Sequence, residues 1–191
     1  YTIQVNQTPV ASFTKSVSSG CTPLTVHLNN TSANTNGASY LWDFGNGSTS
    51  TDASPDVTYN TAGTYTIQLQ VTNASGCTDT TSQTVQVNAT PVAIASTADT
   101  TGCPPYLSTF VNNSTNATGY LWNFGDGVTS SAATPSHTYN TAGNYTVTLI
   151  AFNAAGCSDT LVLPQTITIH QTPIASFTQS ATTGCAPLSV N

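Results

Sequence analysis

The residues of this 191-residue chain that could do chemistry are five cysteines, seven acidic residues and three histidines. Aspartates and histidines can act as general acids and bases or bind metal ions, and cysteines can form disulfides, bind zinc or act as nucleophiles. All the acidic residues are Asp, and Lys15 is the one Lys or Arg residue. Such a small set of reactive side chains, without Arg to clamp a phosphate, argues against an enzyme.

The charge balance excludes two further classes of protein. Nucleic-acid binding needs clustered Lys and Arg that displace counterions from phosphates, and binding to anionic lipid needs the same residues. One lysine within a net charge of −6 supplies neither surface. No apolar run approaches the roughly 18 residues of a membrane span, so we expect no membrane insertion. The chain begins with neither Met nor a signal-peptide pattern, and we expect it to be part of a longer protein.

Recurring motifs show that the chain is built from repeats. Thr-Pro occurs at residues 8–9, 90–91 and 172–173, and Gly-Cys at 20–21, 102–103 and 184–185, so each interval is 82 residues. These intervals predict four segments: the last strand of a preceding repeat at 1–7, complete repeats at 8–88 and 89–170, and the start of a further repeat at 171–191. The Thr-Pro linkers are short, and proline restricts its own backbone and that of the preceding residue.

Apolar and polar residues alternate with a period of two inside each repeat. In residues 65–71 every odd position is apolar, and residues 145–149, 85–87 and 167–169 continue the pattern. One face of such a strand meets a core while the other meets water, and no helical periodicity is present. About seven short strands per repeat, separated by Gly, Pro and Asn, predict an all-β chain of tandem immunoglobulin-like β-sandwich domains.

The most distinctive string is Tyr-Leu-Trp-Asp-Phe-Gly-Asn-Gly at residues 40–47, which recurs as Tyr-Leu-Trp-Asn-Phe-Gly-Asp-Gly at 120–127. Val-Thr-Tyr (57–59) and Gly-Thr-Tyr-Thr-Ile-Gln-Leu (63–69) follow it in the first repeat. His-Thr-Tyr (137–139) and Gly-Asn-Tyr-Thr-Val-Thr-Leu (143–149) follow it in the second. These strings resemble the hallmark of the PKD (polycystic-kidney-disease) domain family.

Several residues of these strings are predicted to be structural. Alternation places the tryptophan on the core face, and the glycines supply the positive φ of a tight hairpin. A tyrosine that opens a strand two residues after a glycine is similar to the tyrosine corner of immunoglobulin-type sandwiches. The predicted core and turn residues are Trp42, Gly45, Gly47, Tyr65, Trp122, Gly125, Gly127 and Tyr145.

The carboxylate of the hallmark changes place between the repeats. Asp43 with Asn46 in the first repeat becomes Asn123 with Asp126 in the second. A turn-capping side chain needs only the Asx oxygen, whereas a hard-cation site needs charge in a fixed place. We therefore expect turns and neither a metal nor a cofactor, with a weak calcium site as the alternative. The three histidines occupy unrelated repeat positions, so no catalytic arrangement is predicted: His27, His137 and His170.

The cysteines recur at matching places in the two repeats. Cys21 and Cys77 are 56 positions apart, and Cys103 and Cys157 are 54 apart. Two identically placed cysteines per repeat predict one intradomain disulfide each, Cys21–Cys77 and Cys103–Cys157, and therefore an oxidising compartment. No repeat offers four clustered Cys or His at zinc spacing. Cys185 is unpaired within the chain, and its partner is expected past residue 191 or, alternatively, in another chain.

The resemblance implies an extracellular module that spaces, stiffens or presents other parts of large surface proteins and secreted hydrolases. Thr-, Ser- and Asn-rich arrays of this kind resemble the giant cell-surface adhesins of Bacteroidota, some of which serve gliding motility and use type IX secretion. We expect a structural stalk or filament repeat that holds an adhesive region away from the cell. The alternative is a carbohydrate-binding or accessory module of a secreted hydrolase.

The expected partners are neighbouring repeats of the same chain, other copies of the filament, and an unidentified surface or glycan target. The sequence offers no row of exposed aromatics for a glycan, since Ala95 is the counterpart of Phe13 and Phe177. Three Asp-Thr pairs resemble an O-glycosylation signal of secreted Bacteroidota proteins, with ordinary strand-edge polar residues as the alternative. The candidate acceptors are Thr80, Thr100 and Thr160.

Overall fold

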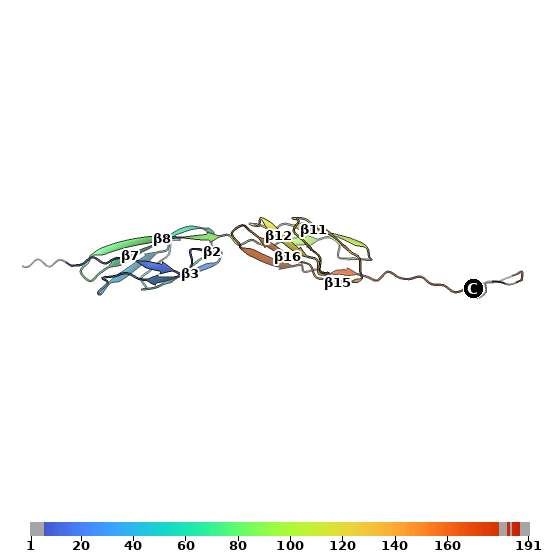
Figure 1. The fold of residues 1–191 in the computed structure, drawn as a ribbon, viewed down its shortest axis with the longest axis horizontal. Coiled ribbons are helices and arrows are strands. Elements are labelled where there is room, and N and C mark those ends of the chain that lie inside the picture. Colours follow the sequence, from blue (N-terminus) through green and yellow to red (C-terminus); the bar gives the residue numbers. More distant parts are fainter. Residues whose placement is uncertain (1–5, 180–182, 184, 188–191) are drawn as a thin grey trace, which may run out of the picture.

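A computed structural model describes residues 6–179, 183 and 185–187 of the chain. All regular elements in these residues are β-strands, and they form two β-sandwich domains that follow each other along the long axis (Figure 1). The predicted all-β, tandem architecture is thus confirmed. The strand expected at residues 1–7 lies outside the described residues, apart from Asn6 and Gln7. The described residues include no helix that could cross a bilayer.

The first domain packs two sheets face to face. One sheet has the strand order β1-β3-β6 and the other has the order β2-β8-β7-β4-β5. Its strands are β1 (Phe13–Lys15), β2 (Ser19–Cys21), β3 (Leu24–Asn30), β4 (Ser39–Asp43), β5 (Thr49–Ser50), β6 (Asp56–Tyr59), β7 (Gly63–Thr72) and β8 (Thr78–Asn88). The long antiparallel hairpin β7–β8 forms one side of the domain over most of its length, and β2 joins β8 in parallel.

The second domain repeats this plan with shorter strands. Its sheets have the orders β14-β11-β9, β13-β12-β16-β17 and β10-β18-β15. The strands are β9 (Ala95–Thr97), β10 (Thr101–Gly102), β11 (Tyr106–Asn112), β12 (Gly119–Asn123), β13 (Thr129–Ser130), β14 (Ser136–Tyr139), β15 (Gly143–Tyr145), β16 (Thr148–Phe152), β17 (Ser158–Val162) and β18 (Ile167–Ile169).

The hairpin that is continuous in the first domain is interrupted in the second. In the last strand of the first domain Val87 pairs with Gly63, and in the last strand of the second domain Ile169 pairs with Gly143. Val87 comes 10 positions after Cys77, whereas Ile169 comes 12 positions after Cys157, so the second domain carries two extra residues here. Pro164 lies in this segment, and it cannot donate to the ladder because proline has no backbone N–H.

Each domain is built around a fully buried tryptophan from the β4 or β12 strand. Trp42 and Trp122 are both 0% exposed, and their indole N–H groups donate to the carbonyls of Asp52 and Ala132 at 2.9 and 3.1 Å. Phe13 meets Trp42 edge to face with ring centroids 5.1 Å apart. The buried residues of β7 and β8 alternate with exposed ones, as the period-two pattern predicted.

The hairpin after β4 is held by two Asx side chains and two glycines. Asp43 Oδ1 accepts the N–H of Gly45 at 2.8 Å, and Asn46 Oδ1 accepts the N–H of Ser48 at 3.0 Å. The φ angles are +74° at Gly45 and +87° at Gly47, a region that L-residues with a Cβ rarely adopt.

These two glycines supply a matched test of the fold. An added Cβ on Gly45 would lie 2.6 Å from the carbonyl oxygen of Thr66, whereas one on Gly47 would meet nothing within 4 Å. Gly47→Ala should therefore lower the free energy of unfolding only by the penalty of a left-handed backbone, about 1 kcal/mol. Gly45→Ala should lower it by roughly 2 kcal/mol more, because the backbone must move to make room for the Cβ. Urea unfolding of each variant measures both values. Equal losses would contradict the tight approach of β7 to this turn.

Candidate functional site

The two cysteines of the first domain lie at opposite ends of the sandwich. In the parallel β2–β8 pair, Cys21 is opposite Asn88, the last residue of β8. Cys77 immediately precedes Thr78, the first residue of β8. A strand rises about 3.3 Å per residue, so the ten steps from Thr78 to Asn88 cover roughly 33 Å. A disulfide requires Cα atoms within about 7 Å, so these two cysteines cannot pair with each other.

The structure instead joins the two domains by a disulfide between Cys21 and Cys157, whose Cα atoms are 5.7 Å apart. The predicted pairs Cys21–Cys77 and Cys103–Cys157 are therefore wrong. The cysteines of the second domain occupy equivalent places: Cys103 directly follows β10, as Cys21 ends β2, and Cys157 directly precedes β17, as Cys77 precedes β8. Three cysteines are free thiols: Cys77, Cys103 and Cys185.

Hydrogen bonds hold the linker between the domains against the end of the first domain. The N–H of Thr22, directly after the bridging cysteine, donates to the carbonyl of Asn88 at 2.9 Å. The N–H of Thr90 donates to the Thr22 hydroxyl at 3.1 Å, and the Thr90 hydroxyl donates to the Thr22 carbonyl. The three residues 88–90 are half-buried as a result.

The second domain also forms a hydrogen bond with this linker. Asn153 opens the turn that ends in Cys157, and its side-chain N–H donates to the carbonyl of Ala89 at 2.8 Å. The other half of the amide accepts the N–H groups of Ala155 and Cys157, both at 3.1 Å. One asparagine thus shapes the cysteine turn and attaches it to the linker. Three contacts hold the joint: the hydrogen bonds between Thr22 and Thr90, the hydrogen bond from Asn153 to Ala89, and the disulfide.

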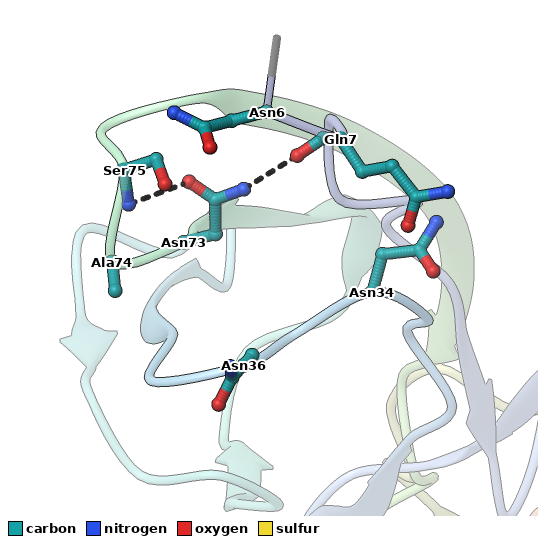
Figure 2. A pocket seen from close by; sticks show the side chains of 7 residues that line it. All are labelled: Asn6, Gln7, Asn34, Asn36, Asn73, Ala74 and Ser75. Atoms are coloured by element: carbon teal, nitrogen blue, oxygen red, sulfur yellow. Dashed lines mark hydrogen bonds between the residues drawn. The ribbon is translucent and has the colours of Figure 1, made fainter. Parts of the chain in front are cut away.

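The outer end of the first domain carries the same turn with a free cysteine. Asn73 donates to the carbonyl of Gln7 at 2.7 Å and accepts the N–H of Cys77 at 3.0 Å. Beside this turn is an open hollow of about 370 Å³ (Figure 2). It is lined mostly by amide side chains: Asn6, Gln7, Asn34, Asn36, Asn73, Ala74 and Ser75.

An aspartate two residues after each turn cysteine anchors the start of its domain. Asp79 Oδ2 accepts the N–H of Ala11 at 2.8 Å, and Asp159 Oδ2 accepts the N–H of Ala93 at 2.8 Å. The N–H groups of Ala11 and Thr80 hold the pKa of the Asp79 carboxyl below its ordinary value. These carboxylates therefore have a structural use: each holds the backbone at the start of its domain.

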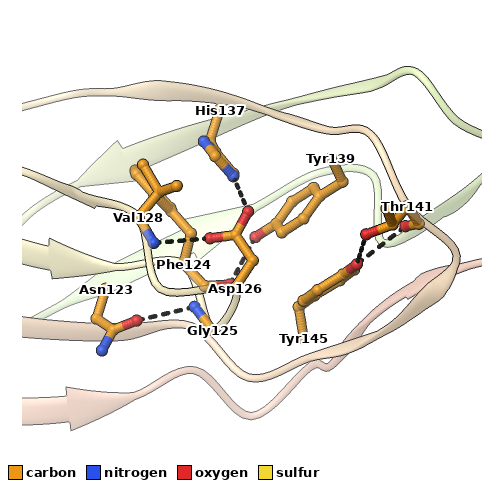
Figure 3. Close-up of polar contacts among 9 residues, drawn as sticks. All are labelled: Asn123, Phe124, Gly125, Asp126, Val128, His137, Tyr139, Thr141 and Tyr145. Carbon is orange, nitrogen blue, oxygen red and sulfur yellow. Dashed lines mark hydrogen bonds and ion pairs between the residues drawn. The ribbon is translucent and has the colours of Figure 1, made fainter.

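The hallmark turn of the second domain contains a carboxylate–imidazole pair (Figure 3). Asp126 Oδ2 lies 2.6 Å from Nε2 of His137, and its Oδ1 accepts the N–H of Val128 at 3.0 Å. The imidazole stacks on Phe124 with centroids 4.3 Å apart. Burial works to raise the pKa of Asp126, but the hydrogen bonds from His137 and Val128 outweigh it, and this pKa is lowered.

Two tyrosines in each domain hold the neighbouring crossing of the chain. Tyr65 donates to the carbonyl of Thr61 at 2.8 Å, and Tyr145 donates to the carbonyl of Thr141 at 2.9 Å. These are contacts of the tyrosine-corner type. Tyr59 donates to the carbonyl of Phe44 at 2.9 Å and is stacked on Tyr65, and burial raises its pKa to about 12.

Reactive side chains are scattered over the described residues rather than gathered. Among them, no group of three or more His, Cys, Asp or Glu side chains could hold a metal ion. His27 Nδ1 lies 2.8 Å from Asp56 Oδ1 in an exposed pair of the first domain, whereas His137 is largely buried in the second domain. Lys15 donates to the carbonyl of Thr84. Among the described residues these side chains therefore serve turns, strand contacts and the joint.

Two segments of the chain, residues 6–89 and 88–169, match the family model of the PKD domain. The chain belongs to the PKD domain family. The resemblance carried by the hallmark strings is thus confirmed, and both domains described above are PKD domains.

Known relatives place PKD domains of this kind in proteases and collagenases. The chain is 46% identical over 95 residues to the pre-pro-metalloprotease PrtV of Vibrio cholerae, which covers 47% of this chain and 10% of that protein. It is 44% identical over 61 residues to a microbial collagenase of Vibrio alginolyticus, covering 32% of this chain and 8% of that protein. This chain therefore spans about a tenth of the length of the curated relatives it matches, or less.

A solved PKD domain is also similar to this chain in sequence. The crystal structure of the PKD1 domain from the Vibrio cholerae metalloprotease PrtV is 46% identical in sequence. It covers 42% of this chain and 98% of that domain, with a TM-score of 0.38.

A string that surrounds the late cysteine recurs in both repeats. Asn-Ala-x-Gly-Cys-x-Asp occurs at residues 73–79 and again at 153–159. In the PKD fold its asparagine donates to the segment before its own domain, and its aspartate accepts from the start of that domain. The string therefore marks the turn that holds the entry to its domain, and its recurrence is the signal that residue spacing alone did not provide.

The candidate glycosylation residues lie on different surfaces of the PKD domains. Thr80 in β8 and Thr160 in β17 are exposed, whereas Thr100 is half-buried and its carbonyl accepts the N–H of Thr168 at 2.7 Å. Glycosylation of these threonines stays a prediction.

Thiol counting distinguishes the interdomain bridge from intradomain pairing. The chain secreted into an oxidising compartment and then unfolded without reductant should react with three equivalents of a thiol reagent, since Cys77, Cys103 and Cys185 are free. Two intradomain bridges would leave only one reactive thiol. The double variant Cys21→Ser/Cys157→Ser should also show three, whereas Cys77→Ser should show two. A count of one in the unsubstituted chain would overturn the pairing.

Acid should remove part of the stability of the second PKD domain through Asp126. Its folded pKa is lowered, so its stabilising contribution is present above the unfolded value of about 3.9 and is lost as pH falls through the folded value. The melting temperature of Asp126→Asn should therefore lie below that of the native chain at pH 7, and the gap should shrink below about pH 4. Calorimetry at several pH values measures both.

The matched control for this loss of one carboxylate is Asp56→Asn. The Asp56–His27 contact is exposed on both sides, so its removal should change the melting temperature little. A gap for Asp126→Asn that stays constant from pH 7 to pH 3 would contradict the role of the Asp126 carboxylate.

Proposed function

We propose that the two PKD domains form a non-catalytic spacer of a secreted protein, which holds the parts on either side of it apart. The observation that carries this proposal is the covalent Cys21–Cys157 bridge across the joint. Tandem domains joined by short linkers normally move relative to each other unless their interface is large and apolar. Here a disulfide and hydrogen bonds from both domains to the linker do this work instead.

An extracellular location fits the same bridge. Disulfides persist in oxidising compartments and are rare in the cytosol. In the chain-entropy model, a bridge that closes 136 residues is worth about 5 kcal/mol against unfolding of both domains together. A chain with few charged residues and short strands gains a large share of its stability from such a link.

We favour a role as an accessory module of a secreted hydrolase. Relatives with a similar segment include a metalloprotease precursor and a collagenase, and in each of them the matching segment is a small part of the whole protein. The catalytic residues would then lie in other parts of the protein. A carbohydrate-binding role has less support, because Phe13, one of two aromatic candidates for a glycan platform, is 3% exposed and packs in the core.

The stalk of a cell-surface adhesin, used in attachment or gliding, is the second candidate. Its specific support is the third set of repeat motifs at residues 172–187, which indicates an array longer than two domains. The mechanical task of the bridged joint is the same in either setting, and only the parts that it separates differ.

Pulling on single molecules tests the spacer directly. With handles at residues 8 and 171, the bridge leaves 13 + 14 = 27 residues outside the closed loop, which limits the extension to roughly 95 Å. The Cys21→Ser/Cys157→Ser variant should extend over all 163 residues, to roughly 570 Å. Cys77→Ser should behave like the native chain.

Small-angle scattering of the same oxidised chain supplies the second readout. An elongated particle is expected, and a compact particle would overturn the spacer. Extension of the oxidised native chain to the length of the double variant would overturn the mechanical role of the bridge.

A further inference from the structure

The single bridge leaves half of a joint at each outer end of the pair. Cys77 lies in the turn at the outer end of the first domain, at the place that Cys157 holds in the second. Cys103 lies at the outer end of the second domain, at the place that Cys21 holds in the first. The two bonded cysteines are more buried than their counterparts: Cys157 is 2% exposed against a half-buried Cys77, and Cys21 is half-buried against an exposed Cys103.

The turn around Cys77 is already shaped as in the joint. Asn73 holds Gln7 as Asn153 holds Ala89, with N–O distances of 2.7 and 2.8 Å. The two residues differ in exposure. Gln7 is exposed, whereas Ala89, which lies at the joint, is half-buried. The hollow in Figure 2 borders this turn, so the surface that the second domain turns toward its neighbour is uncovered in the first.

The strand before Cys103 is also presented as it is before Cys21. Gly102 pairs in parallel with Ile169, as Gly20 pairs with Val87. A side chain four residues on covers each glycine: an added Cβ would lie 2.4 Å from Leu24 at Gly20, and 2.1 Å from Tyr106 at Gly102. The backbone that carries each early cysteine is therefore held in the same way.

We propose that Cys77 and Cys103 form further interdomain bridges of the same kind. Cys103 bonds to the cysteine of the following PKD repeat that corresponds to Cys157, and Cys77 bonds to the cysteine of the preceding repeat that corresponds to Cys21. Cys185, the cysteine of the third Gly-Cys motif, starts the next bridge in the series. This proposal rests on the proposed spacer being part of a longer array.

Each new bridge forms one S–S bond from two thiols, with loss of two protons and two electrons. The electron acceptor is the disulfide of a thiol–disulfide oxidoreductase in the oxidising compartment, which is reduced to a dithiol. The reaction proceeds through a mixed disulfide that the second thiolate of the pair attacks. No other reactant is needed.

Such a series gives the array two interleaved covalent paths. From a late cysteine the chain runs to the next early cysteine, 103 − 77 = 26 or 185 − 157 = 28 positions on, and then crosses a bridge to the repeat beyond. Tension along the array is then carried by these short segments and the bridges, while the rest of each domain lies inside a closed loop. A pulled array cannot unravel domain by domain.

Peptide mapping of the full-length polypeptide, purified from its native cells, tests the proposal. Free thiols are blocked before digestion with chymotrypsin, because Lys15 is the one Lys or Arg in this region and trypsin would leave it nearly whole. We expect Cys103 in a peptide joined to the following repeat and Cys77 in one joined to the preceding repeat. Blocked Cys77 and Cys103, or a Cys77–Cys103 link, would overturn the proposal.

A three-domain chain gives a second measurement. Residues 1–171 followed by a second copy of residues 90–170 contain six cysteines, two more than residues 1–171 alone. We expect both oxidised chains to show two free thiols, because Cys103 bonds to the added copy of Cys157. Replacement of that added cysteine by Ser should raise the count to three. Four thiols in the unsubstituted three-domain chain would overturn the proposal.

The same sample separates this inference from the proposed function. Four free thiols in an elongated particle would contradict the proposed series of bridges but would agree with the proposed spacer. A compact particle, measured by small-angle scattering, would remove the spacer whatever the thiol count.

Discussion

The length of the β7–β8 hairpin is the constraint on which the organisation of this chain depends. It places the late cysteine of a PKD domain at one end and, through the parallel β2–β8 pair, the early cysteine at the other. A strand of eleven residues cannot be folded back to bring them together without loss of the sheet. The sulfur atoms can therefore meet only across a joint, and a disulfide that would otherwise stabilise one domain becomes a link between two.

Polar side chains of both domains hold the linker at the joint. Asn153 satisfies backbone groups of its own turn and of the linker at once, and the Thr22 hydroxyl accepts the N–H of Thr90 from the other side. Because the sequence has one Lys or Arg, hydroxyls and amides are its main surface polar groups, and these groups fix the linker. Such contacts also depend little on ionic strength.

The two PKD domains reach the same hallmark turn with different chemistry. The first uses neutral Asn46 and has Val57 where the second has His137, whereas the second uses Asp126 and pairs it with that histidine. Since both turns cap the same backbone N–H groups, the Asp126–His137 pair is a local addition that the fold does not require. Its expected effect is therefore on the stability of one domain and its acid sensitivity.

Much of the architecture could be predicted from residue patterns. The period-two alternation in residues 65–71 identified core-facing positions, because side-chain direction in a strand depends only on the local backbone. The interruption of the second hairpin at Pro164 and the burial of Phe13 depend on local sequence as well, though neither was predicted. The joint was missed because the string at residues 73–79 and 153–159 gives no sign, by itself, of what its asparagine contacts.

The sequence by itself determined the repeat, the β-sandwich class, the aromatic core and the Asx turns, since each follows from local periodicity and from motifs that recur at fixed intervals. Only the tertiary structure decided which cysteines pair. Cys21 is nearer in sequence to Cys77 than to Cys157, yet disulfide formation depends on separation in space. The order of strands within the sheet sets that separation, and the spacing of residues along the chain does not contain it.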